Sequence, residues 1–228
     1  MISWLCQMLI NIVLIVISYF FGTLPFAVFL ARRAGLDPDK EEDLHIALYH
    51  KVSKAQAFLA GLVDFLKGII PVLVAFGLNL SPAVVAFSGV AAAAGQMWPP
   101  TRRSHGERGN TTGAGAMITL ILVFQAYIVL LALIPAIVVG IVATRIETGN
   151  SKAMPIGNLI AFTMVPLLLW LSGQPEGLIW GSLVLLILLI IRRLTAGLKA
   201  DLNTGRGAAR ILANRFIFDQ SFPNDTEE

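Results

Sequence analysis

The feature that most constrains this chain is its series of long apolar segments. A helix needs about 20 mostly apolar residues to cross the hydrocarbon core of a bilayer. Charged residues make up only 14% of the chain, whereas soluble domains carry roughly 25%. The sequence therefore predicts an all-α polytopic membrane protein. Its clearest candidate spans are residues 3–31, 55–78, 82–98, 156–172 and 178–191.

Segment 113–144 is too long for one spanning helix and short for two, and the positions of Lys and Arg decide between these readings. Basic residues concentrate in the cytoplasmic loops of membrane proteins. If the N-terminus lies outside and 113–144 crosses twice, turning near Gln125, sixteen of the seventeen basic residues lie on the cytoplasmic side. A single crossing would place the basic C-terminal tail outside. We therefore predict about seven transmembrane helices, with the N-terminus outside and the C-terminus in the cytoplasm.

This topology defines the expected organisation of the chain. Residues 1–198 form a single transmembrane helical domain with cytoplasmic loops at 32–54, 99–112 and 145–155. Residues 199–228 form a cytoplasmic tail, basic at first and then acidic. A basic segment beside a final helix is typical of contact with anionic lipid headgroups, so membrane lipids are expected partners. Nucleic acid is not expected, because the basic residues follow the topology and form no aromatic-interleaved patch.

Lys67 is the one basic residue within a predicted span, and Asp64 precedes it by three residues on the same helical face. Ionisable groups inside a span are costly and usually face the protein interior. The two side chains are expected to form a supporting intramembrane pair. Such a pair either orients its helix or takes part directly in substrate binding. A transporter is a further alternative, but the spans show no clear inverted repeat.

The loop 99–112 has the composition of an anion site. Two prolines end the preceding span, and glycines allow the backbone to approach a ligand closely. A basic residue and the N–H groups at the start of a helix attract phosphate. A flexible basic loop without a ligand is the alternative. The predicted phosphate-binding residues are Gly106, Arg108, Gly109, Asn110, Thr111 and Thr112.

The loop 32–54 combines several carboxylates, between residues 37 and 43, with His45 and His50. Such groups can bind a divalent metal, but two histidines five residues apart do not match the i, i+4 spacing of a helical metal pair. We expect a solvated amphipathic segment on the membrane surface, with neither a metal nor a cofactor. His45 and His50 are the candidate general bases, and no other residue is proposed as catalytic.

A series of short motifs occurs in an order and at spacings that resemble the bacterial acyl-phosphate:glycerol-3-phosphate acyltransferase family, of the PlsY type. The third span ends in Gly95-Gln96-Met97-Trp98-Pro99, where the family has G-H-x-F-P. The loop Gly106-Glu107-Arg108-Gly109-Asn110-Thr111-Thr112 follows, where the family has a GGKGVAT phosphate-binding loop. The other matches are Ser18-Tyr19-Phe20-Phe21-Gly22-Thr23-Leu24-Pro25, Gly35-Leu36-Asp37, Asp64-Phe65-Leu66-Lys67-Gly68, Thr144-Arg145 and Ile191-Arg192-Arg193-Leu194-Thr195-Ala196-Gly197.

The resemblance implies a seven-helix enzyme of phospholipid biosynthesis in the bacterial inner membrane, with its functional loops in the cytoplasm. Its substrates would be acyl phosphate, as the acyl donor, and glycerol 3-phosphate or a related phosphorylated acceptor. Two family motifs are missing, however. The SGNxGATN motif would fall on residues 40–47, and a His-Arg-Glu-Asn run is replaced by Ile187-Leu188-Leu189-Ile190. The alternative is therefore a catalytically inactive family member that binds a lipid phosphate or a partner protein.

Overall fold

The computed structural model describes residues 2–41, 43–101, 106–145, 154–203 and 207–219, and every regular element in these ranges is a helix. The predicted all-α fold class is confirmed. The elements are α1 (Ile2–Gly22), α2 (Phe26–Arg33), α3 (Leu44–Lys51), α4 (Lys54–Gly77), α5 (Pro82–Met97), α6 (Asn110–Val123), η1 (Tyr127–Ala132), α7 (Leu133–Arg145), α8 (Met154–Leu171), α9 (Glu176–Thr195), α10 (Leu198–Leu202) and α11 (Ala208–Phe218).

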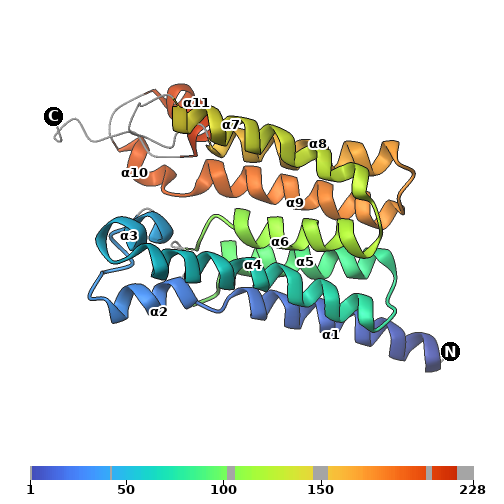
Figure 1. Cartoon of the computed structure of the whole chain (residues 1–228). Coiled ribbons are helices and arrows are strands. Elements are labelled where there is room, and N and C mark those ends of the chain that lie inside the picture. The colour runs from blue at the N-terminus through green and yellow to red at the C-terminus, as the bar shows by residue number, and fades with distance from the viewer. Residues whose placement is uncertain (1, 42, 102–105, 146–153, 204–206, 220–228) are drawn as a thin grey trace.

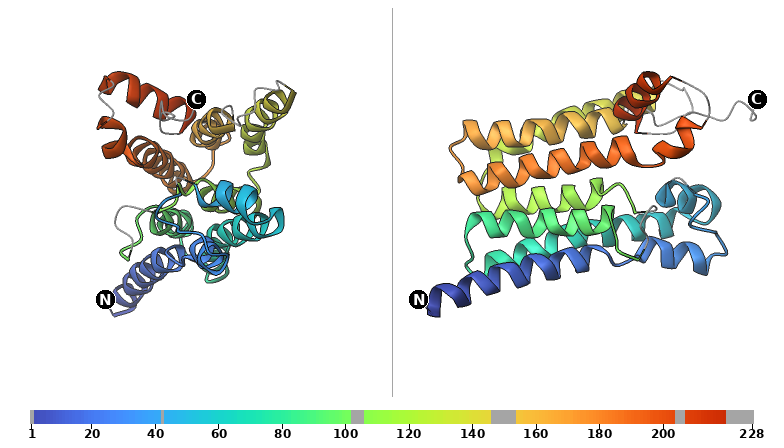
Figure 2. Two further views of the ribbon diagram at one scale, coloured as in Figure 1. Left: turned by 90° about the vertical axis from the view of Figure 1, so that its left-hand side faces the viewer. Right: turned by 180° about the vertical axis from the view of Figure 1, so that it is seen from behind.

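The long helices lie side by side in two groups (Figure 1). Helices α1, α4, α5 and α6 form one group, and α7, α8 and α9 form the other. The view from behind shows the same division (Figure 2). The two described chain ends lie at opposite ends of the bundle, as an odd number of passes requires. The short helices α2, α3, α10 and α11 all gather at the end opposite the N-terminus.

Helix α5 lies at the centre of the bundle, where it contacts α1, α4, α6 and α9. Its sequence is rich in alanine and glycine, and Ala86, Ala92 and Ala93 are fully buried. Small side chains let helix backbones approach closely, which is how helices associate in a membrane. Large apolar side chains instead point outward from α1, α4, α7 and α8, among them Phe20 and Leu167. An apolar outer surface of this kind suits a lipid environment.

Three helical segments are long and apolar enough to cross a membrane: Trp4–Arg33, Lys54–Gly77 and Glu176–Thr195. Four shorter apolar helices accompany them. Segment 113–144 contributes two of these, since α6 and the continuous η1–α7 rod run in opposite directions (Figure 1). The chain reverses at Gln125, whose φ of 56° is left-handed. The predicted division of this segment is confirmed, while the exact number of passes and their orientation stay predictions.

The predicted first span, 3–31, is interrupted. Helix α1 ends at Gly22 and α2 begins at Phe26, with Pro25 between them at the N-cap of α2. Proline has no backbone N–H and disfavours a helical conformation in the residue before it, so a continuous helix is broken at this point. The break lets α2 lead the chain into the loop 32–54 at the end of the bundle.

The loop 32–54 is only partly the solvated segment predicted from the sequence. Asp37, Asp39 and Lys40 are exposed, as expected. Helix α3, however, buries Leu44 and Leu48 in a small apolar cluster shared with α2 and α4. The carboxylate of Asp43 caps α3 by accepting hydrogen bonds from the N–H groups of residues 45 and 46. The loop therefore packs against the bundle and brings α3 over the polar end of α4.

The tail also differs from a simple lipid-binding segment. Helix α11 contacts α8 and α9. Its Arg215 is buried and pairs with Asp201, with Nε–Oδ2 and Nη2–Oδ2 distances of 2.7 Å. Arg215 is therefore not available to lipid headgroups, although it belongs to the basic segment for which the sequence predicts such contact. The interior of the predicted loop 145–155, residues 102–105 and the acidic end of the tail lie outside the described residues.

Candidate active site

Polar groups from four distant parts of the chain meet near α3. Helix α3 and the start of α6 lie at the end of the bundle opposite the N-terminus (Figure 1). Helix α3 supplies His45, the first half of α4 supplies Asp64, and the segment leading into α6 supplies Glu107. The end of α9 contributes Arg192. This is the end at which the sequence places the cytoplasmic loops.

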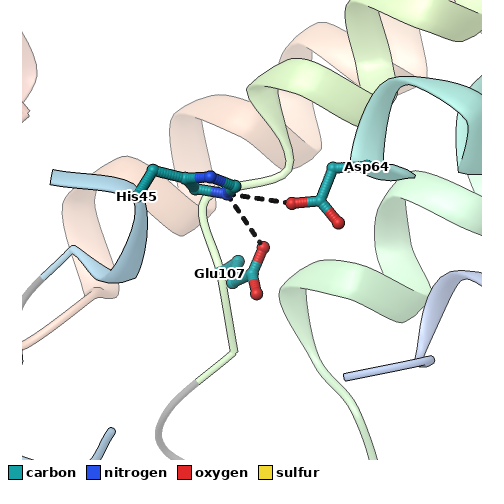
Figure 3. Close-up of side chains that lie close together, drawn as sticks. All are labelled: His45, Asp64 and Glu107. Carbon is teal, nitrogen blue, oxygen red and sulfur yellow. Dashed lines mark hydrogen bonds and ion pairs between the residues drawn. The ribbon is translucent and has the colours of Figure 1, made fainter. Parts of the chain in front are cut away.

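The imidazole of His45 lies between two carboxylates (Figure 3). Its Nε2 is 2.9 Å from Oδ2 of Asp64 and 3.6 Å from Oε2 of Glu107. The Asp64 side chain is fully buried, whereas 16% of the Glu107 side chain and 30% of the His45 side chain are exposed. Solvent therefore reaches the cluster mainly at His45, and the carboxylate of Asp64 is shielded from it.

Asp64 and Lys67, the predicted pair, are in contact in the structure, while their supporting role at the site stays a prediction. Nζ of Lys67 donates to Oδ1 of Asp64 at 2.7 Å, and both side chains are buried. The carboxylate thus uses one oxygen for Lys67 and the other for His45. The hydroxyl of Thr112 donates to the backbone carbonyl of Asp64 at 2.8 Å, which ties the start of α6 to α4.

The charge state of His45 follows from its two acidic neighbours. Burial alone would lower its pKa, but the hydrogen bonds and charges of Asp64 and Glu107 outweigh burial and raise the pKa of His45 to about 10. Burial raises the pKa of Glu107, and the nearby Asp64 charge adds to this, while His45 opposes it. At neutral pH, His45 is therefore an imidazolium that donates hydrogen bonds. This state does not suit a general base, because the proton-accepting nitrogen is already protonated.

The segment 106–109 is held in place from two sides. Its Glu107 N–H donates to the carbonyl of Gln96 at 3.1 Å, and Nε2 of Gln96 donates to Oε2 of Glu107 at 2.6 Å. Arg192 donates from Nε to the carbonyl of Glu107 at 3.1 Å and from Nη2 to the carbonyl of Gly106. Gly109 then takes a left-handed φ of 76° at the N-cap of α6, a conformation that favours glycine.

The residues predicted to bind phosphate fall into two groups. Thr112 and Gly109 are buried, and the Thr112 hydroxyl is already bonded to α4, so these two residues shape the loop. Gly106, Arg108, Asn110 and Thr111 are half-buried. The first turn of α6 directs toward this surface N–H groups that have no partner within the helix. Their role in phosphate binding stays a prediction.

Arg108 already contacts an anion in the folded chain. Its Nη1 lies 3.4 Å from Oδ2 of Asp219, and Nε of Arg193 lies 3.7 Å from the same oxygen. Burial raises the pKa of Asp219, while the charges of Arg108 and Arg193 oppose that rise. Asp219 belongs to the tail at the end of α11, so the tail places a carboxylate on the arginine of the predicted phosphate loop.

Two hollows flank the contact between His45 and Glu107. A cavity of ≈ 20 Å³, large enough for one water-sized group, is lined by Lys67, Gln96 and Glu107, among others. An open groove of ≈ 660 Å³ lies on the other side, between α3 and α4, and is lined in part by His45 and His50. His50 is exposed in this groove and does not join the carboxylate cluster.

Four residues of this end of the bundle were missed by the sequence analysis: Gln96, Glu107, Arg192 and Asp219. A signal for three of them was present, since Arg192 belongs to a motif that carries the family resemblance. Gln96 stands where the quoted family pattern has histidine, and Glu107 stands where it has glycine. Asp219 could not be found in this way, because it lies beyond the motifs that carry the resemblance.

Comparisons with known proteins give a consistent result. Residues 12–199 match the family model described as glycerol-3-phosphate acyltransferase. A protein of that name from Rubrobacter xylanophilus is 29% identical over 73% of this chain and 79% of its own length. Another from Pseudomonas syringae is 30% identical over 83% of this chain and 92% of its own length.

Solved structures give the same fold. A crystal structure of PlsY, an integral membrane glycerol 3-phosphate acyltransferase, in its glycerol 3-phosphate form has a TM-score of 0.65 and 21% identity. Its lysophosphatidic acid form has a TM-score of 0.62 and 22% identity. Each match covers 89% of this chain and 98% of the solved one.

Proposed function

This chain belongs to the glycerol-3-phosphate acyltransferase family, and we propose that it transfers an acyl chain from acyl phosphate to glycerol 3-phosphate. In this reaction a hydroxyl oxygen of the acceptor attacks the acyl carbonyl carbon. The bond from that carbon to the phosphate oxygen breaks, and phosphate leaves with the bonding electrons. The hydroxyl proton ends on the released phosphate. The products are lysophosphatidic acid and inorganic phosphate.

The observation that carries this proposal is the convergence of cationic groups at one end of a membrane bundle. Both substrates are anions, so a shared site needs positive charge and N–H donors. Arg108 and the first turn of α6 are both part of the predicted phosphate loop. Lys67 lines the small cavity below it. These groups bind and orient the phosphates, which lowers the entropic cost of bringing two substrates together.

The groove between α3 and α4 offers a place for the acyl donor. Its lining combines apolar Ile46, Ala57 and Phe58 with cationic Lys54, whose Nζ lies 5.5 Å from the ring centre of Tyr49. An acyl phosphate has the same combination of an apolar chain and an anionic head. We place the chain along the apolar side of this groove and the phosphate toward its polar lining residues Lys54 and His45.

A transfer assay tests the proposed activity. The purified chain, in nanodiscs of neutral phosphatidylcholine, receives acyl phosphate and radiolabelled glycerol 3-phosphate. We expect lysophosphatidic acid and inorganic phosphate in equal amounts. Arg108→Ala lowers the rate, whereas Arg33→Ala, an exposed cation at the end of α2, serves as the matched control. Binding of both substrates without any product contradicts the enzymatic proposal.

The catalytically inactive alternative has its own support. A run of isoleucine and leucine, 187–190, stands where the family has a polar motif. In addition, the carboxylate of Asp219 already pairs with the guanidinium of Arg108. On this alternative the chain binds a lipid phosphate, and Asp219→Asn strengthens that binding while no acyl product forms. The same nanodisc preparation therefore separates the two functions, because binding and product are measured on one sample.

The proposed location is the bacterial inner membrane, with the site facing the cytoplasm. The convergence of the basic loops at one end supports this orientation. A fluorescent protein fused to the C-terminus folds in the cytoplasm and not in the periplasm. Bright cells are expected, whereas dark cells that contain the full-length fusion contradict the orientation.

A further inference from the structure

The cluster of His45, Asp64 and Glu107 has the geometry of a metal centre. Their nearest ligand atoms all lie within 4.8 Å of one another, and two of the separations, both measured from Nε2 of His45, are 2.9 and 3.6 Å. Two ligand atoms about 2.1 Å from one ion lie roughly 3 Å apart in octahedral and roughly 3.5 Å apart in tetrahedral geometry. Small side-chain rotations are therefore enough to place all three atoms around one ion.

A buried oxygen beside the cluster points independently to a ligand. Gln96 is 5% exposed, and its Nε2 donates to Oε2 of Glu107, so the amide faces the cluster. Its Oε1 is buried and has no hydrogen-bond partner among the described residues. A buried polar atom without a partner is costly. Rotation of the amide would turn Oε1 toward Glu107, where a cation held between the two oxygens would give both of them a partner.

The residues of this cluster also depart together from the quoted family pattern. His45 lies in the stretch 40–47, where the serine–asparagine motif is absent. Gln96 and Glu107 replace a histidine and a glycine of that pattern, while Asp64 of D-x-x-K-G is retained. Three separate departures meet around one retained carboxylate.

We propose that His45, Asp64 and Glu107 bind a divalent transition-metal ion, with Oε1 of Gln96 as a fourth ligand. An imidazole combined with carboxylates and an amide oxygen suits Mn²⁺ or Zn²⁺. On binding, the ion replaces the imidazole proton, which passes to solvent. Lys67 continues to hold Oδ1 of Asp64, which leaves Oδ2 for the ion.

The spacing of the two histidines had argued against a metal in this loop. The two histidines do not act as a pair in the structure, because His50 faces the open groove and His45 turns toward α4. The ligands of the proposed site come from three segments that are distant in the sequence, so no short motif in the sequence indicates a metal site. The open groove beside His45 gives the ion a path to the site.

The ion would also add positive charge at this end of the bundle. With a protonated His45, the charges of the two carboxylates are balanced by the imidazolium and Lys67. A divalent ion with a neutral imidazole leaves one positive charge more. This charge lies next to the predicted phosphate loop and offsets the acidic residues, which would otherwise repel an anionic substrate.

Metal binding is tested on the full chain in nanodiscs of neutral phosphatidylcholine, stripped with EDTA and titrated with Mn²⁺ alone. The loss of the free Mn²⁺ signal in electron paramagnetic resonance counts the bound ion. We expect one Mn²⁺ per chain, displaced by Zn²⁺. His45→Gln and Glu107→Gln each weaken binding about tenfold or more. Asp37→Asn, an exposed acid of the same loop paired with Lys40, leaves it unchanged.

Three outcomes overturn the proposal. The first is the absence of saturable Mn²⁺ or Zn²⁺ binding by the folded chain. The second is equal binding by the wild type, His45→Gln and Glu107→Gln, each shown to be folded by its thermal transition. The third is loss of binding in Asp37→Asn, which would place the ion on the acidic loop. None of these measurements uses acyl transfer, so failure of the proposed reaction and failure of the metal site are read separately.

Discussion

The buried pair of Asp64 and Lys67 gives a quantitative prediction about stability. Lys67→Met keeps most of the side-chain volume but removes the ammonium group. The fully buried Asp64 then keeps His45 as its remaining charged partner among the contacts described. Breaking a buried pair from one side costs about 3–5 kcal/mol, because the other charge is left uncompensated. Since His45 stays in place, we expect the lower end, about 3 kcal/mol.

Thermal unfolding in detergent, followed by the fluorescence of the four tryptophans, measures this cost. A loss of about 3 kcal/mol lowers Tm by about 6–12 °C for a chain of this length. The double variant Asp64→Asn/Lys67→Met recovers most of the loss, because neither charge is then buried alone. Lys40→Met, which breaks an exposed pair with Asp37, is the control and changes Tm by about 2 °C or less.

Either of two results would contradict this prediction. In the first, the Tm of Lys67→Met stays within the range of the Lys40→Met control. In the second, the double variant is less stable than Lys67→Met alone. The second result would mean that the carboxylate of Asp64 is stabilised by its other contacts without help from the ammonium group.

Three further predictions follow from other contacts. Gly68→Ala places a Cβ against the backbone at the start of α6 and lowers stability by about 1–3 kcal/mol, whereas Gly61→Ala meets open space and leaves Tm nearly unchanged. Arg192→Ala removes the donors to two loop carbonyls, and we expect a raised KM for glycerol 3-phosphate in the transfer assay. Asp219→Asn removes one negative charge from beside Arg108 and lowers that KM by about fivefold, the equivalent of about 1 kcal/mol; an unchanged KM argues against Arg108 as a phosphate ligand.

Much of the fold could be predicted because hydropathy and charge act through local sequence. The reversal at Gln125 follows from the length of segment 113–144 and from the placement of basic residues. The contact between Asp64 and Lys67 follows from helical spacing alone. The break before Pro25 was missed, because a long apolar average hides an interruption of a few residues.

The candidate site was predicted only in part, because its contacts depend on how α3 folds back over α4. Nothing local in the sequence links His45 to Glu107, and the acidic character of the loop indicated a solvated segment. The burial of Leu44 and Leu48 turns α3 inward and carries His45 with it. Likewise, the arginine of the predicted phosphate loop was recognised, whereas its partner in the tail required the packing of α11 on α9.

The central claim is that the converging loops form one site for phosphorylated substrates. Its most direct test is kcat/KM for glycerol 3-phosphate in the nanodisc transfer assay, compared between Arg108→Ala and Arg33→Ala. Loss of a charge-assisted contact to phosphate, about 1.5–3 kcal/mol, predicts a fall of about tenfold or more for Arg108→Ala and little change for Arg33→Ala. Equal kcat/KM values in the two variants, with both proteins folded, would contradict the account.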